Sequence, residues 1–159
     1  MKIILAFTTA LLLYFQSGDL ATLRNSYTQA NSSNTNTQSF ITTAGKQSGS
    51  NATILGYKAA AKIMEAKIAK KGRPALVKEG ATSLESVIAK NPNNMELRVI
   101  RLSIQENLPK IVGYRSSIKT DKTYILANYS KQSADLKSYI KKYAAQSKSL
   151  TLEEKSSLK

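Results

Sequence analysis

Apolar residues recur at every third or fourth position along most of the 159-residue chain, which is the pattern of amphipathic helices. No stretch alternates between apolar and polar residues for long enough to predict a strand. Residues 31–38 and 45–50 are rich in Asn, Ser, Thr and Gly, so we expect them to be loops. The pattern predicts helices over residues 19–30, 40–44, 51–72, 74–90, 94–108, 117–129 and 133–146. The chain is therefore predicted to be all-α.

The helix predicted between Asn51 and Gly72 has the strongest pattern, with a good N-cap at its start and a good stop at its end. Its apolar residues form two stripes on different sides, Ile54, Tyr57, Ala61, Met64 and Ile68 on one, and Leu55, Ala59, Ile63 and Ala66 on the other. Because a surface helix needs only one stripe, this helix should be central in the fold. Only Gly72 and Arg73 separate it from the next helix, which predicts an antiparallel hairpin.

Residues 80–98 place the turn Asn91-Pro92-Asn93-Asn94 between two helical stretches. This segment resembles the junction between two tetratricopeptide (TPR) repeats. The helices that begin near Ala52 and Met95 are about 43 residues apart, whereas that family repeats at about 34 residues, so an array of this kind would be degenerate. We expect antiparallel helical hairpins, arranged either as a degenerate TPR-like array or as a small orthogonal helix bundle.

The segment from Glu96 to Pro109, followed by Gly113-Tyr114 and Asp121-Lys122, resembles small exported helical proteins of Gram-negative bacteria. The resemblance implies a helical fold and an envelope context, and it implies no particular chemistry.

The N-terminus has the layout of a secretory signal peptide, with Lys2 before the apolar run 3–15 and a polar exit over 16–19. This predicts export to the periplasm or the medium. A spanning helix needs about 20 apolar residues, so we expect no transmembrane span after processing. A membrane anchor and a buried N-terminal helix are the alternatives. The predicted organisation is a signal peptide over 1–18, a single helical domain over 19–146 and a polar tail over 147–159.

The chain contains no His and no Cys, which excludes a Ser-His-Asp triad, a thiol nucleophile and Cys-ligated metal sites. Ser-x-x-Lys pairs occur at 116/119, 138/141 and 156/159, but the partner motifs of the penicillin-binding class are absent. The carboxylates show neither calcium-loop spacing nor an evident catalytic pair. We therefore predict a protein that is not an enzyme, with no catalytic residues, no metal and no cofactor; a hydrolase ranks last among the alternatives.

Arg98 and Arg101 stand out because they lie on a predicted helix that is otherwise rich in Leu and Ile. One hypothesis is a binding surface for a carboxylate or phosphate, formed by Arg98 and Arg101 with Tyr114 nearby. The alternative is an internal ion pair of either arginine with Glu106 or Asp121, since a partly buried Arg is usually paired.

The formal net charge is +14, and the basic residues are spread over most of the chain. On the last predicted helix, Lys137, Lys141 and Lys142 form a basic surface, while Tyr139 and Tyr143 lie on the apolar stripe. Export argues against nucleic acid as the partner. We expect an exported, non-catalytic interaction or scaffold module for a protein or peptide, in particular an acidic one. The alternative is a basic surface-binding protein for anionic envelope components, either lipid or polysaccharide.

Overall fold

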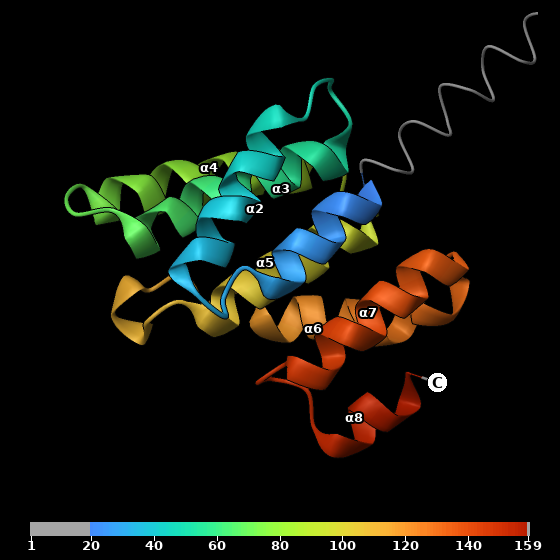
Figure 1. The fold of residues 1–159 in the computed structure, drawn as a ribbon. Coiled ribbons are helices and arrows are strands. Elements are labelled where there is room, and N and C mark those ends of the chain that lie inside the picture. Colours follow the sequence, from blue (N-terminus) through green and yellow to red (C-terminus); the bar gives the residue numbers. More distant parts are fainter. Residues whose placement is uncertain (1–19, 159) are drawn as a thin grey trace, which may run out of the picture.

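The computed structural model describes residues 20–158, and every regular element within them is a helix (Figure 1). The predicted signal peptide, 1–18, lies outside the described residues. A first helix covers residues 20–29. It is followed by α2 (Asn34–Lys46), α3 (Ala52–Ile68), α4 (Arg73–Lys90), α5 (Met95–Asn107), η1 (Lys110–Val112), α6 (Ile118–Asn128), η2 (Tyr129–Lys131), α7 (Ala134–Gln146) and α8 (Leu152–Ser157). The all-α prediction is confirmed.

Helix α3 is central to one half of the molecule, as its two apolar stripes predicted. It packs against α2, α4 and α5. Both stripes are mostly buried, and the small residues between them let the neighbours approach. A Cβ atom added to Gly80 of α4 would lie 2.7 Å from the carbonyl oxygen of Ala59, and one added to Gly56 would meet Leu97 of α5. The glycines therefore set how closely α3, α4 and α5 pack.

The α3–α4 hairpin forms as expected, although α3 ends earlier than predicted. Asn51 caps α3 by accepting from the backbone N–H groups of Thr53 and Ile54. The helix stops at Ile68, and Gly72 serves instead as the N-cap of α4, with a φ of 72° that favours glycine.

The prediction of a loop over residues 31–38 is wrong, because α2 begins at Asn34. Ser33 caps the helix by accepting from the N–H of Asn36. Thr37 is buried, and its hydroxyl donates to the carbonyl oxygens of Ala30 and Ser33. The polar residues of this segment satisfy the helix terminus locally, which composition alone does not distinguish from a loop.

Helices α2–α4 form one end of the molecule and α6–α8 the other, with the first helix and α5 between them (Figure 1). Nearly every residue of α5 is buried, and it contacts α3, α4, α6 and α7. An aromatic cluster joins the first helix to α2 and α3: the ring centroid of Tyr27 lies 5.0 Å from that of Phe40 and 5.5 Å from that of Tyr57.

The segment predicted as a polar tail, 147–159, continues the packed structure as far as residue 158. Ser147, Leu150 and Leu158 are buried. A capping box of Thr151 and Glu154 starts α8, and Lys122 of α6 forms an ion pair of 2.8 Å with Glu154. None of the helices in residues 20–158 has the length and apolar character needed to cross a bilayer.

Candidate functional site

The predicted binding residues Arg101 and Tyr114 are brought together, but in an internal network. Arg101 binds Asp121 of α6 in a bidentate manner, with Nε–Oδ2 and Nη2–Oδ1 distances of 2.7 Å. Its third nitrogen donates to Glu85 of α4 at 2.5 Å. The Tyr114 hydroxyl donates to the other oxygen of Glu85. Both partners of Arg101 are carboxylates of this chain, so its guanidinium is occupied by the fold itself.

Arg98 is occupied in the same way. Its Nη1 lies 3.0 Å from Oδ1 of Asp121, and two other nitrogens donate to the carbonyl oxygen of Pro92. The guanidinium lies over the ring of Tyr124, 4.2 Å from the centroid. The structure therefore matches the internal ion pair, with Asp121 and Glu85 as the acids rather than Glu106.

Tyr114 is held as a neutral hydrogen-bond donor. Burial, together with the hydrogen bond to Glu85, raises the pKa of its phenol well above the usual range. A phenol in that state is a poor general base or nucleophile. Together the cluster of Glu85, Arg98, Arg101, Tyr114 and Asp121 joins α4, α5, α6 and the η1–α6 connection.

Lys141 and Lys142 of the predicted basic surface are exposed on α7, and Lys137 is half-buried. The ammonium group of Lys137 lies 5.9 Å from the centroid of the Tyr129 ring. Within residues 20–158, none of these three lysines forms an ion pair with a carboxylate. Of the two tyrosines assigned to the apolar stripe, Tyr139 is buried and Tyr143 partly so.

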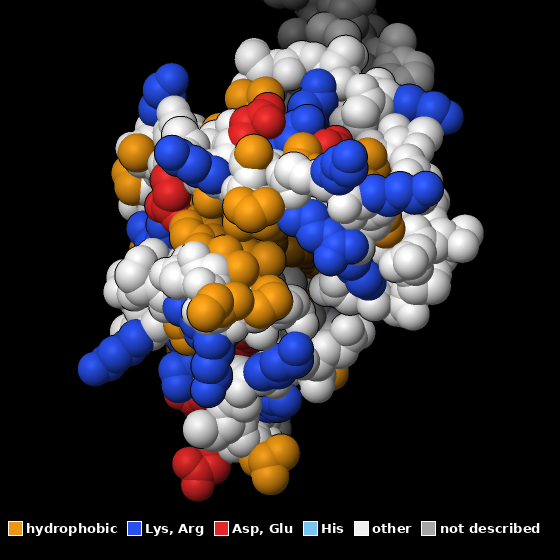
Figure 2. Space-filling model, turned by 90° about the vertical axis from the view of Figure 1, so that its left-hand side faces the viewer, with side chains coloured by type: hydrophobic (Ala, Val, Ile, Leu, Met, Phe, Trp, Pro, Cys, Tyr) orange, Lys and Arg blue, Asp and Glu red, His pale blue; other side chains and the backbone are white. Residues whose placement is uncertain are grey.

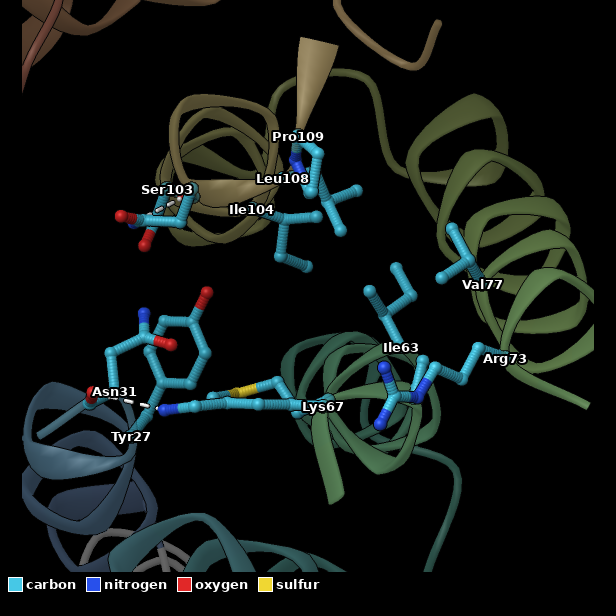
Figure 3. Close-up of a pocket in the computed structure, with 13 residues that line it drawn as sticks. Tyr27, Asn31, Ile63, Lys67, Arg73, Val77, Ser103, Ile104, Leu108 and Pro109 are labelled. Atoms are coloured by element: carbon cyan, nitrogen blue, oxygen red, sulfur yellow. Dashed lines mark hydrogen bonds between the residues drawn. The ribbon is translucent and has the colours of Figure 1, made fainter. Parts of the chain in front are cut away.

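A groove that the sequence analysis did not identify lies where the first helix, α3, α4 and α5 meet. Its volume is about 260 Å³. Figure 3 shows Ile104 and Leu108 pointing toward Ile63 across the groove, with Val77 on one side and Tyr27 on the other. Most of its lining is apolar, and the polar groups stand at the edge. The lining consists of Tyr27, Asn31, Ile63, Met64, Ala66, Lys67, Arg73, Val77, Ser103, Ile104, Asn107, Leu108 and Pro109.

Two cations and no carboxylate belong to the groove lining. The Lys67 ammonium donates to the carbonyl oxygen of Asn31 at 3.0 Å, and Nε of Arg73 donates to that of Ala69 at 2.8 Å. Among the described residues, neither forms an ion pair. Figure 2 shows hydrophobic side chains gathered in a hollow on this side of the molecule, with Lys and Arg side chains around it.

The groove could not be predicted from the sequence, because its residues come from four helices and the periodicity does not specify how those helices cross. One signal was available. Lys67 and Arg73 belong to a basic cluster at the α3–α4 turn, residues 62–73, which also contains Lys62, Lys70 and Lys71 but only Glu65 as an acid. A basic turn beside apolar helix ends indicates where an anionic group would be attracted.

No group of three metal-ligating side chains that could hold an ion occurs among residues 20–158. The groove presents apolar side chains, amides, hydroxyls and two cations, which suit non-covalent binding. No family model matches the chain, and neither does any curated protein or solved structure in the comparisons made. The fold and the groove thus define an all-α helical protein with an apolar, cation-edged surface groove.

Proposed function

We propose that the protein is a non-catalytic binding module that holds an apolar segment of an acidic protein or peptide in the groove between the first helix and α3–α5. The observation that carries this proposal is the combination of an apolar floor with two cations that have no carboxylate partner among the described residues. Apolar burial supplies affinity, and Lys67 and Arg73 favour carboxylates at the edge of the bound segment.

The dimensions of the groove favour side-chain anchors over a whole small molecule. Its volume of about 260 Å³ lies just below the roughly 300–1,000 Å³ of ordinary ligand pockets. Next to Pro109, the η1 turn exposes Ile111 to 96% and Val112 to 39%. Protein interfaces commonly combine a few apolar anchors in pockets with a surrounding surface, and this arrangement offers both.

The charge of the whole chain supports an acidic partner. A net charge of +14 attracts anionic partners over a long range and speeds their association. The N-terminal pattern supports export, so we propose that this binding takes place in the periplasm or outside the cell.

The proposal is tested with a synthetic amphipathic peptide that carries Leu and Phe anchors flanked by Asp and Glu. Its affinity is measured by fluorescence anisotropy, beside a peptide in which Lys replaces each acid. Ala66→Phe fills the groove and should weaken binding at least about tenfold. Ala89→Phe, an equal enlargement at an exposed position of α4, should leave binding unchanged. Equal affinity for both variants, or for both peptides, contradicts the proposal.

The basic surface of Lys137, Lys141 and Lys142 supports a second candidate, attraction to anionic envelope components, because no described carboxylate neutralises it. Two double variants of equal net charge separate the candidates. The variant with Lys67→Gln and Arg73→Gln should bind the acidic peptide more weakly. The variant with Lys141→Gln and Lys142→Gln should bind more weakly to vesicles that contain anionic lipid. If only the vesicles bind, and the α7 variant abolishes that binding, the second candidate replaces the first.

A further inference from the structure

A second, smaller cavity lies between the first helix, α5 and α7. Its volume is about 90 Å³. Tyr27, Tyr139 and Glu106 form its buried part, and Asn31, Asn107 and Gln146 at its edge are exposed. The lining contains one carboxylate and no Lys or Arg, which is unusual in a chain with a net charge of +14.

The carboxylate of Glu106 is buried without a cation. Glu96 is neutralised by Arg24 at 2.7 Å, and Asp121 is neutralised by two arginines. Among the residues that the structure describes, Glu106 forms no ion pair. A buried charge without a counter-charge is costly, so a cation that enters this cavity is stabilised by it.

Hydrogen-bond donors already occupy the oxygens of Glu106. Oε1 accepts from the Ser147 hydroxyl at 2.6 Å and from the backbone N–H of Ser149 at 2.9 Å. The Ser149 hydroxyl donates to the same oxygen, and the Tyr143 hydroxyl donates to Oε2 at 2.9 Å. A carboxylate has about four acceptor positions, so a further ammonium N–H finds little left to bind while the negative charge remains.

Three tyrosines, Tyr27, Tyr139 and Tyr143, line the cavity together with this charge. Burial raises the pKa of each phenol above its usual range, so the rings stay neutral. The Tyr139 ring already lies 5.7 Å from the Arg24 guanidinium, and the Tyr27 ring packs against Phe40 and Tyr57. The three tyrosines therefore offer the cavity a neutral and largely apolar wall beside the charge of Glu106.

We propose that this cavity binds a small methylated ammonium group, held by the charge of Glu106 and by apolar contact with Tyr27, Tyr139 and Tyr143. Methylation fits because such a group needs charge and apolar contact and few hydrogen-bond acceptors. A volume of about 90 Å³ equals roughly three water molecules at about 30 Å³ each, which suits an ammonium head group and excludes a large ligand. The proposal does not depend on the function of the neighbouring groove.

Choline chloride is the probe, and its uncharged carbon isostere is the matched control. Both are titrated into the full chain at constant ionic strength and followed by NMR of the tyrosine ring signals. Choline should saturate and bind at least about tenfold more tightly than the isostere, since only choline carries charge. Equal binding of the two, or no saturation by choline, overturns the proposal and leaves Glu106 only as the anchor of residues 147–149.

Two variants then locate the site. Glu106→Gln removes the negative charge and should lower the affinity for choline at least about tenfold. Circular dichroism checks that this variant is folded. Lys148 donates to Asn107 at the edge of the cavity at 2.7 Å. Lys148→Gln removes a positive charge that repels choline, so the affinity for choline should rise about twofold. Weaker binding by Lys148→Gln contradicts this location, and because that residue is exposed the test does not depend on the stability of Glu106→Gln.

Discussion

At the scale of single residues, buried carboxylates hold α5 to its neighbours. Glu96 of α5 accepts two bonds from Arg24 of the first helix and one from the Tyr57 hydroxyl of α3. Asp121 of α6 accepts from Arg101 of α5 and is fully buried. These contacts specify which helices meet, since Glu96 and Asp121 are each buried beside an arginine from a neighbouring helix.

Removing the charge of Asp121 should destabilise the fold strongly. Asp121→Asn keeps the size of the side chain but leaves Arg101, whose side chain is 8% exposed, without its bidentate partner. We expect a loss of about 3–5 kcal/mol in the free energy of unfolding, measured by urea denaturation. Glu79→Gln, at a side chain that is 63% exposed, is the control and should change little. A loss below about 1 kcal/mol for Asp121→Asn would show that the network contributes little.

Gln105, unlike the paired carboxylates Glu96 and Asp121, is a buried polar residue whose side chain has no hydrogen-bond partner among the described residues. Its side chain is fully buried, and both of its polar atoms lack a hydrogen-bond partner among the described residues. Gln105→Met keeps a similar shape and removes the unsatisfied groups, so we expect a stabilisation of about 1–3 kcal/mol in the same denaturation experiment. Destabilisation would contradict the assignment of the Gln105 amide as an unsatisfied buried group.

At the scale of elements, local signals were sufficient where a helix is long and its caps are ordinary. The two stripes of α3 predicted its central place, and Asn51 and Gly72 marked the hairpin within a few residues. The first half of α2 was missed, although the sequence predicted a helix over 40–44. Ser33 and Thr37 satisfy the start of this helix through hydrogen bonds with the backbone, whereas the composition of the segment is typical of loops. The packing of residues 147–158 depends on distant partners, Glu106 and Lys122, which no local pattern specifies.

The contacts of Glu154 with Lys122 and Thr151, which hold α8 to α6, should weaken in acid. The hydrogen bond from Lys122, followed by that from the Thr151 backbone, lowers the pKa of Glu154 below its ordinary 4.5. The folded form therefore binds the proton more weakly than the unfolded form, so the stabilisation is fully present above pH 4.5 and is lost as the pH falls through the lower, folded value.

The amide signal of Thr151, which donates to Glu154, reports this titration by NMR. Its midpoint should lie below pH 4.5, and Glu154→Gln should abolish the change. A midpoint at or above pH 4.5 would contradict the claim that Lys122 and Thr151 lower the pKa of Glu154.

At the scale of the whole molecule, α5 connects the two ends and lines both cavities. Residues Ser103 and Asn107 of this helix border the groove and the smaller cavity alike. The sequence singled out Arg98, Arg101 and Tyr114, and all three take part in one internal network. Their partners Glu85 and Asp121 lie on other helices, so the pattern of α5 alone does not identify them. The groove likewise exists only once four helices cross, so the periodicity predicted the elements and not the site.

The central claim, that the groove is the binding surface, is tested most directly by mapping the acidic peptide with amide NMR. The account predicts that the largest shift changes fall on Ile63, Val77 and Ile104, at the walls of the groove. Changes confined to Lys137, Lys141 and Lys142 on α7, with the groove signals unmoved, would contradict it.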